Sequence, residues 1–206
     1  VRQHDGLLAK TLFVVTDQGA YDALTTFDKT LNVGLEPYST PKNMAYGDYS
    51  YHDFVLFRTK LVLRILQLKV TLWLVESDAV WLQDPSAVVL GTPGDIVTMD
   101  DHKKPNNTVP GDKLIQGGFQ LLRPTEATVL AWTTMAKKLE TVLQNAKKQR
   151  KRKKKKDKGE INLGNDGNEQ RIMNSIIYGN TTNVHVSWLD PLLFIPGNMY
   201  RGTYPG

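Results

Sequence analysis

Apolar runs of two kinds alternate along this chain, and that alternation limits the fold more than any other feature. Short, largely apolar runs are typical of strands buried on both faces, and they fall at residues 11–16, 71–75, 95–99, 119–122 and 184–186. Two longer stretches space their apolar residues by three and four, as amphipathic helices do, one over residues 53–69 and one after Pro124. This alternation predicts an α/β fold with a mostly parallel central sheet flanked by helices.

Each of the two expected helices presents an apolar face. In the first helix, we expect that face to consist of Phe54, Phe57, Leu61, Ile65 and Leu68. In the second, we expect Val129, Trp132, Ala136, Leu139 and Leu143, with Glu126 in the first turn, where the helix dipole favours a negative charge.

The composition excludes several classes of protein and site. The length of 206 residues suits one domain, and the absence of cysteine excludes a disulfide framework, a zinc finger, an iron–sulfur site and a thiol nucleophile. The four histidines show no ligand spacing, which argues against a zinc site. The longest apolar stretch, residues 61–75, contains two basic residues and is too short to span a bilayer.

A single tract produces the net charge of +5. Ten basic residues and one acid lie between Lys147 and Lys158, and the rest of the chain is mildly acidic. We expect residues 147–167 to form a solvated basic and glycine-rich inserted loop, held open by its own repulsion. Two alternatives remain open, binding to an anionic partner such as a membrane, an acidic glycan or nucleic acid, and a nuclear localisation signal.

Acidic residues come directly after several of the expected strands. They are Asp17, Glu76, Asp78, Asp100 and Asp101. Ligands bind beyond the carboxyl ends of the strands in open α/β sheets, but aspartate is also common in turns, which explains Asp17 and the pair at 100–101 as well. Glu76 and Asp78 differ because both lie between apolar runs, where unpaired carboxylates lose hydration and repel each other. Mg²⁺ or Mn²⁺ holding a diphosphate would offset that cost.

Four segments resemble a known family in their order along the chain. Residues 76–85, ESDAVWLQDP, resemble the acidic-x-Asp motif of GT-A glycosyltransferases, in particular of the nucleotide-diphospho-sugar transferase family, which includes cell-wall α-xylosyl-, arabinosyl- and galactosyltransferases. The other three are QGGFQLLRPT at 116–125, NEQRIMN at 168–174 and VSWLDPLLFIPG at 186–197. The resemblance covers roughly residues 11–200 and implies a GT-A-like, Rossmann-type sandwich.

The resemblance implies a site for a donor and a metal ion. Asp78 would bind Mn²⁺ (or Mg²⁺), and Glu76 would share the metal or face the ribose. Lys60 and Gln116 would lie near the donor. Gly117–Gly118 would let the backbone approach the donor closely, although a simple turn explains this pair equally well. Glu76 and Gln116 are each one methylene longer than the usual family residue.

The same resemblance implies the groups nearest the reacting sugar. Glu169, also one methylene longer than the family's aspartate, would hold sugar hydroxyls, and Gln170 would lie beneath the anomeric carbon. A neutral amide is a poor nucleophile, which favours attack by the acceptor from the side of the leaving group. Fixed positive and negative groups would stabilise the charges that separate as the sugar leaves the diphosphate.

Relatives usually begin with a further strand and end near a histidine that completes the metal site. We therefore expect residues 1–206 to be a single catalytic domain, cut short at both ends, from a larger membrane-anchored or secreted protein of the Golgi or secretory lumen. Sequons at Asn106 and Asn180 are compatible with that compartment. His185 is a candidate for the missing metal ligand, although its β-rich surroundings favour a structural role.

The expected function is transfer of a sugar from a nucleotide-diphosphate donor, a UDP-sugar, to a glycan or glycoprotein, with retention of configuration. Two alternatives remain: a catalytically silent module that binds glycan or nucleotide, and a basic protein associated with nucleic acid. The aromatic residues Tyr46, Tyr49, Tyr51 and Phe54 either stack on an acceptor or belong to a loop folded onto the sheet.

Overall fold

The computed structural model divides the chain into two units, Val1–Ala45 and Tyr46–Gly206. It describes residues 10–39, 44–76, 79, 82–101, 113–152, 163, 167–179 and 181–194.

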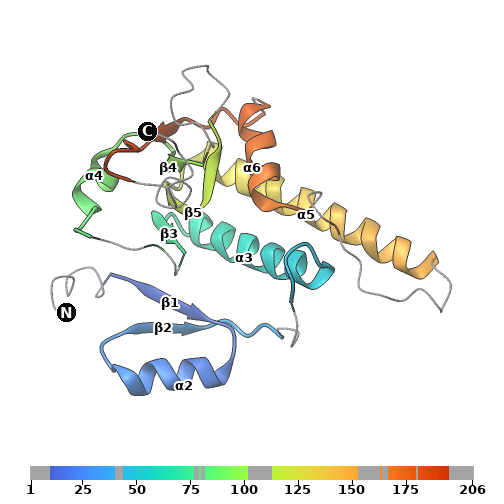
Figure 1. The fold of residues 1–206 in the computed structure, drawn as a ribbon. Coiled ribbons are helices and arrows are strands. Elements are labelled where there is room, and N and C mark those ends of the chain that lie inside the picture. The colour runs from blue at the N-terminus through green and yellow to red at the C-terminus, as the bar shows by residue number, and fades with distance from the viewer. Residues whose placement is uncertain are drawn as a thin grey trace, which may run out of the picture. The chain divides into compact units, whose positions relative to one another are not determined.

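The first unit contains one β-α-β arrangement. Strands β1 (Leu12–Val15) and β2 (Asn32–Leu35) pair in parallel, and helix α2 (Gln18–Phe27) connects them (Figure 1). Asp17 begins the helix, since its carboxylate accepts a hydrogen bond of 2.8 Å from the backbone N–H of Ala20. Asp17 therefore has the structural role that turns and helix caps favour.

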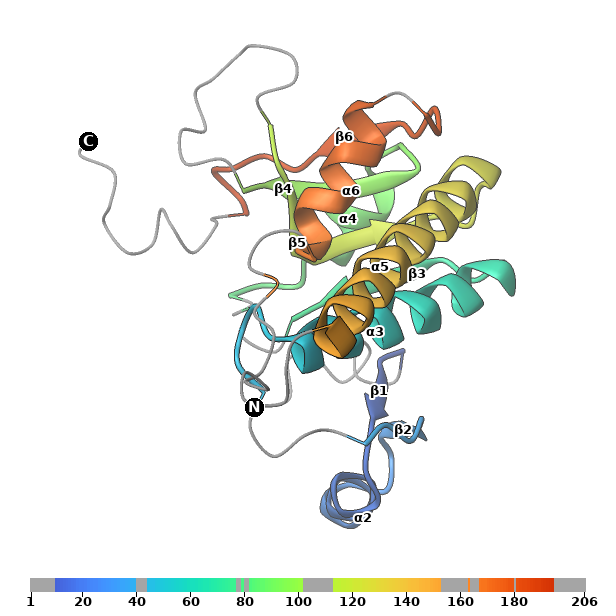
Figure 2. The same ribbon diagram turned by 90° about the vertical axis from the view of Figure 1, so that its right-hand side faces the viewer.

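The second unit contains a sheet with the strand order β3-β5-β4-β6 (Figure 2). Strands β3 (Leu72–Val75), β4 (Ile96–Asp100) and β6 (Val186–Trp188) run in one direction, and β5 (Ile115–Leu122) runs in the opposite direction between β3 and β4. The α/β fold with a helix-flanked sheet is confirmed. Three of these four strands are parallel in direction, but only β4 and β6 pair in parallel, because β5 separates β3 from β4.

Alternate residues of the sheet build two apolar cores, one on each face. On one face, Ile96 and Leu122 pack with residues of α3 (Tyr49–Gln67), α5 (Glu126–Arg152) and α6 (Glu169–Tyr178). On the other face, Val97 and Leu121 pack with Val89 of the short helix α4 (Ser86–Gly91). Side chains of a strand point alternately to the two faces of a sheet, so neighbouring residues enter different cores.

Helix α3 buries a different face from the one that the sequence predicts. The buried residues are His52, Val55, Thr59, Val62 and Leu66, whereas the residues that we expected to form the buried face are only half-buried or, for Leu68, exposed. The helix is apolar on two adjacent sides, so spacing alone did not decide which side meets the core. The helix ends before Lys69, whose φ of 62° is left-handed.

Helix α5 has the predicted apolar face, with Trp132, Leu139 and Leu143 buried. It also continues to Arg152, so the first six residues of the expected basic loop are helical. Residues 153–162 and 164–166 of that loop lie outside the described part of the chain. Among the helices of the described residues, none combines the length and the hydropathy needed to cross a membrane.

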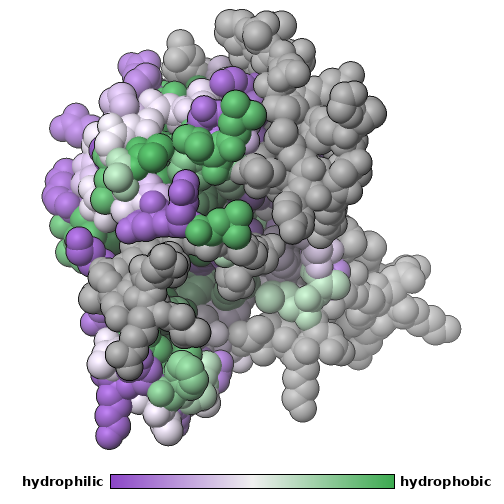
Figure 3. Space-filling model, turned by 60° about the vertical axis from the view of Figure 1, so that its left-hand side comes forward, coloured by the Kyte–Doolittle hydropathy of each residue, from purple (hydrophilic) through white to green (hydrophobic). Residues whose placement is uncertain are grey.

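The larger unit exposes apolar side chains on the side that carries α4, where Figure 3 shows apolar surface interspersed with polar surface. Val88 and Leu90 of α4 contribute to this exposed apolar surface. This side lies on the opposite face of the sheet from α3, α5 and α6.

Candidate functional site

Polar residues gather at one edge of the second unit's sheet. Glu76 follows the last residue of β3, and Asp101 follows the last residue of β4. Strand β5 is antiparallel to both, so its first residues, Gln116–Gly118, lie at the same edge. Ligands bind beyond the carboxyl ends of the parallel strands in folds of this kind.

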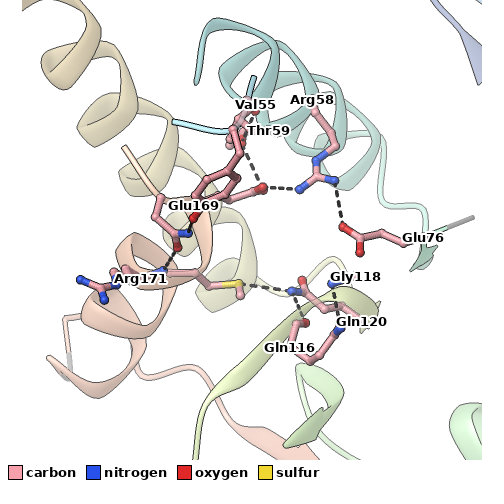
Figure 4. A network of polar contacts seen from close by, with 12 residues as sticks. Val55, Arg58, Thr59, Glu76, Gln116, Gly118, Gln120, Glu169 and Arg171 are labelled. Atoms are coloured by element: carbon pink, nitrogen blue, oxygen red, sulfur yellow. Dashed lines mark hydrogen bonds and ion pairs between the residues drawn. The ribbon is translucent and has the colours of Figure 1, made fainter. Parts of the chain in front are cut away.

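Arg58 of α3 joins two carboxylates at this edge. Its guanidinium pairs with Glu169, the first residue of α6, and lies 3.6 Å from the carboxylate of Glu76. Figure 4 shows Arg58 between the two acidic side chains. The Thr59 hydroxyl also donates to Glu169, at 3.4 Å. We refer to Arg58, Glu76 and Glu169 as the acid–arginine cluster.

The three members of the cluster differ in exposure. The side chains of Arg58 and Glu169 are 29% and 16% exposed, and that of Glu76 is 48% exposed. Burial alone would lower the pKa of Arg58, but the carboxylates of Glu169 and Glu76 outweigh that effect and raise its pKa. Arg58 therefore stays protonated, and Glu76 is the more accessible of the two acids beside it.

Gly118 makes room for the Glu76 side chain. A Cβ on Gly118 would lie 2.2 Å from a carboxylate oxygen of Glu76, so a larger residue would displace that carboxylate. The backbone N–H of Glu76 also donates to the Gly118 carbonyl at 2.8 Å. Gln116 turns back on its own strand, where its side-chain oxygen accepts a hydrogen bond of 2.6 Å from the N–H of Gly118.

A hydrogen bond from its amide nitrogen holds the Gln170 side chain in place. This nitrogen donates to the carboxylate of Asp101 at 2.8 Å. The amide oxygen lies on the side of Gly117, 3.7 Å from where a Cβ on that residue would be. Asn174 fixes the helix to the sheet, because its side chain donates to the Gln170 carbonyl and accepts from the N–H of Ile115. The direction of the Gln170 amide is thus fixed by its neighbours.

Residues 6–204 match the family described as nucleotide-diphospho-sugar transferase. The chain belongs to this family. No curated protein and no solved structure matches the chain significantly. Glu76, Gln116–Gly118, Glu169 and Gln170 lie on the segments through which the sequence resembles this family, whereas Arg58 and Asp101 lie outside those segments.

The structure brings together six of the eight residues that we assigned to the transferase site from the sequence. They are Glu76, Gln116, Gly117, Gly118, Glu169 and Gln170. Asp78 lies outside the described residues. Lys60 is not part of the group, because its ammonium pairs with Glu140 of α5 at 2.5 Å. Two residues along a helix correspond to about 200°, so Lys60 and Arg58 face different sides.

Sequence reasoning missed Arg58, and it left both a turn and a ligand site open for Asp101. A signal for Arg58 was present, since it lies three residues after Val55 and four before Val62, and both valines are buried. A basic residue in line with buried apolar residues needs a partner. For Asp101, the sequence showed its position after a strand but not its partner, because Gln170 is 69 residues away.

His185 lies at the other edge of the sheet. It precedes β6, and its carbonyl accepts hydrogen bonds from the N–H groups of Asp95 and Ile96, where β4 begins. Its own N–H donates to the Asp95 carboxylate at 2.8 Å. These backbone contacts place His185 where β4 and β6 begin, at the end of the sheet opposite Glu76. Within the described residues, no three histidine or acidic side chains are grouped as a metal site.

Proposed function

We propose that this chain is a metal-assisted glycosyltransferase that moves a sugar from a UDP-sugar to a glycan or glycoprotein with retention of configuration. Membership of the family supports a nucleotide-sugar donor. The observation that carries the finer proposal is the acid–arginine cluster beside Gly117–Gly118 and Gln170. It combines an accessible acid, a fixed cation and a fixed amide at the sheet edge where such folds bind ligands.

The carboxylates at this sheet edge suit a hard divalent cation. Glu76 is half exposed beside Gly118 and its carboxylate lies 3.6 Å from Arg58, and the sequence has a second carboxylate two residues later, at Asp78. Mg²⁺ and Mn²⁺ need one or two carboxylates when substrate phosphates and water complete the coordination. When bound, the ion would neutralise the negative charge that develops on the departing diphosphate.

The chain's own residues would act on the sugar. Arg58 fixes the Glu169 carboxylate, which can accept hydrogen bonds from sugar hydroxyls and stabilise positive charge on the ring. The hydrogen bond to Asp101 holds the Gln170 amide, whose oxygen remains on the Gly117 side. A neutral amide does not form a stable glycosyl intermediate, which supports acceptor attack from the leaving-group side.

The proposal is tested by donor turnover. We expect the purified chain to release UDP from a UDP-sugar when Mn²⁺ is present, and Asp78→Ala and Glu76→Gln to lose most of that release. NMR of the transfer product should show the anomeric configuration of the donor. UDP binding without turnover would favour the silent binding module, and turnover unchanged in Asp78→Ala would contradict the metal's proposed role.

We further propose that the chain acts in the Golgi or secretory lumen. The support is the pair of sequons at Asn106 and Asn180, which lie outside the described residues. Expression in a secreting eukaryotic cell should give a chain whose mass falls after endoglycosidase treatment. A mass unaffected by that treatment would contradict this assignment.

A further inference from the structure

An exposed tyrosine is held in place beside the acid–arginine cluster. The Tyr46 side chain is 59% exposed, yet its hydroxyl accepts a hydrogen bond of 2.5 Å from the Asn168 amide. Its ring centroid lies 5.1 Å from that of Tyr51, with the rings tilted by 54°. An aromatic ring fixed from two sides while one surface stays open to solvent is a preorganised contact surface.

Both supports of Tyr46 belong to elements that form the cluster. Asn168 is the N-cap of α6 and directly precedes Glu169. Tyr51 lies on α3 seven residues before Arg58, which places the two on the same side of the helix. Burial raises the pKa of Tyr51, and among the nearby charges Arg58 opposes this rise while Glu169 and Glu76 add to it. Tyr51 thus contacts the Tyr46 ring and lies near the charges of the cluster.

The backbone before α3 fixes the position of Tyr46. Gly47 has a φ of 89°, which favours glycine, and its carbonyl accepts a hydrogen bond of 2.7 Å from the N–H of Leu163. Asp48 then starts α3. The turn that carries Tyr46 is therefore tied to the helix that carries Arg58 and to the segment that leads into α6.

The chemistry of this surface suits an uncharged sugar ring. A pyranose or furanose ring has an apolar C–H face and a rim of hydroxyls, and an aromatic ring beside carboxylates can contact both. Asn168 connects Tyr46 to the Glu169 flank of the cluster, whereas the diphosphate is proposed for the Glu76 flank. We propose that Tyr46 forms the subsite for the sugar ring of a glycan acceptor, an inference that rests on the proposed transferase function.

The test measures binding of simple glycosides rather than turnover. Methyl β-xyloside, methyl β-galactoside and methyl α-arabinoside serve as probes, and saturation-transfer NMR reports contact with the chain. We expect at least one probe to bind, about tenfold more weakly in Tyr46→Ala and near the wild-type affinity in Tyr46→Trp, which keeps an aromatic face. Tyr178→Ala is the matched control, because Tyr178 is also exposed and hydrogen-bonded but ends α6 instead of preceding it.

The subsite proposal is contradicted if no probe binds, if Tyr46→Ala binds as the wild type does, or if Tyr178→Ala weakens binding equally. UDP release from the donor, measured on the same preparations without acceptor, should be unchanged in Tyr46→Ala. Glycoside binding by a wild-type chain that releases no UDP would contradict the transferase proposal and leave a sugar-binding surface at Tyr46.

Discussion

Arg58 on α3 pairs with Glu169 at the first turn of α6, and the two residues are 111 positions apart in the sequence. Glu169 lies where the positive end of the helix dipole also favours a carboxylate. This ion pair therefore fixes the start of α6, and with it Gln170, relative to the helix that packs on the sheet.

Loss of the Arg58 cation should destabilise the protein. In Arg58→Met, the Glu169 carboxylate would be left mostly buried without its counter-ion and near Glu76, so we expect the free energy of unfolding to fall by about 2–3 kcal/mol. Urea denaturation measures the change. Lys60→Met is the matched control, since it removes an exposed ion pair from the same helix and should cost less than about 1 kcal/mol. Equal losses of unfolding free energy in the two variants would contradict the stabilising role of Arg58.

The two adjacent glycines of β5 should respond differently to an added methyl group. Gly118→Ala places a Cβ against the Glu76 carboxylate and should displace it, reducing UDP release by about tenfold to a hundredfold. Gly117→Ala adds a Cβ at ordinary contact distance from Gln170, and we expect a change of less than about threefold. Initial rates of UDP release compare the two variants. A larger loss of UDP release in Gly117→Ala than in Gly118→Ala would contradict the role given to Gly118.

The Asp101 carboxylate should affect the rate of transfer because it orients the Gln170 amide. Asp101→Ala removes the acceptor for the amide nitrogen, so we expect kcat to fall about tenfold while the KM for the donor changes little. Asp101→Asn keeps an oxygen that can accept the same hydrogen bond and should retain most of the rate. A large rise in donor KM with kcat unchanged would instead indicate that Asp101 contributes to binding.

Tyr178 should make stability depend on pH in the alkaline range. Burial, assisted by Asp100, raises the pKa of Tyr178 from 10.0 to about 12. The folded state thus favours the neutral phenol, whose contribution is complete below pH 10 and is lost as the pH rises toward about 12. We expect the urea midpoints of unfolding to converge between pH 10 and about 12 when the wild type is compared with Tyr178→Phe. A constant difference between the two proteins would contradict the assignment.

Local apolar pattern predicted five of the six strands that the structure describes, all but β2, and it marked Glu76 and Asp101 as acidic residues that follow strands. Glu76 and Asp101 each directly follow a strand, and the apolar runs marked those strands to within a few residues. The segment containing Glu169 and Gln170 was assigned by resemblance to the family. No such pattern predicted β5 running antiparallel between β3 and β4, because strand pairing depends on contacts between distant parts of the chain.

Two of our expectations for α3 differ from the structure, namely which face is buried and which basic residue lies at the site. Our assignment took Lys60 from the resemblance to the family and passed over Arg58. Apolar residues on two sides of the helix left its buried side undetermined. The structure buries the side with Val55 and Val62, which carries Arg58 toward the sheet edge and Lys60 toward Glu140 of α5. The predicted and the observed buried faces lie on different sides of the helix, and the observed face brings Arg58 to the site.

The central claim is that the edge beyond β3 binds a nucleotide diphosphate through a divalent cation. Calorimetric titration of UDP into the chain, with and without Mn²⁺, tests this most directly. We expect binding at least about tenfold tighter with Mn²⁺, and no such gain in Asp78→Asn or Glu76→Gln, since each removes a carboxylate that the ion requires. Absence of UDP binding, or equal affinity with and without Mn²⁺ in the wild type, would contradict the account.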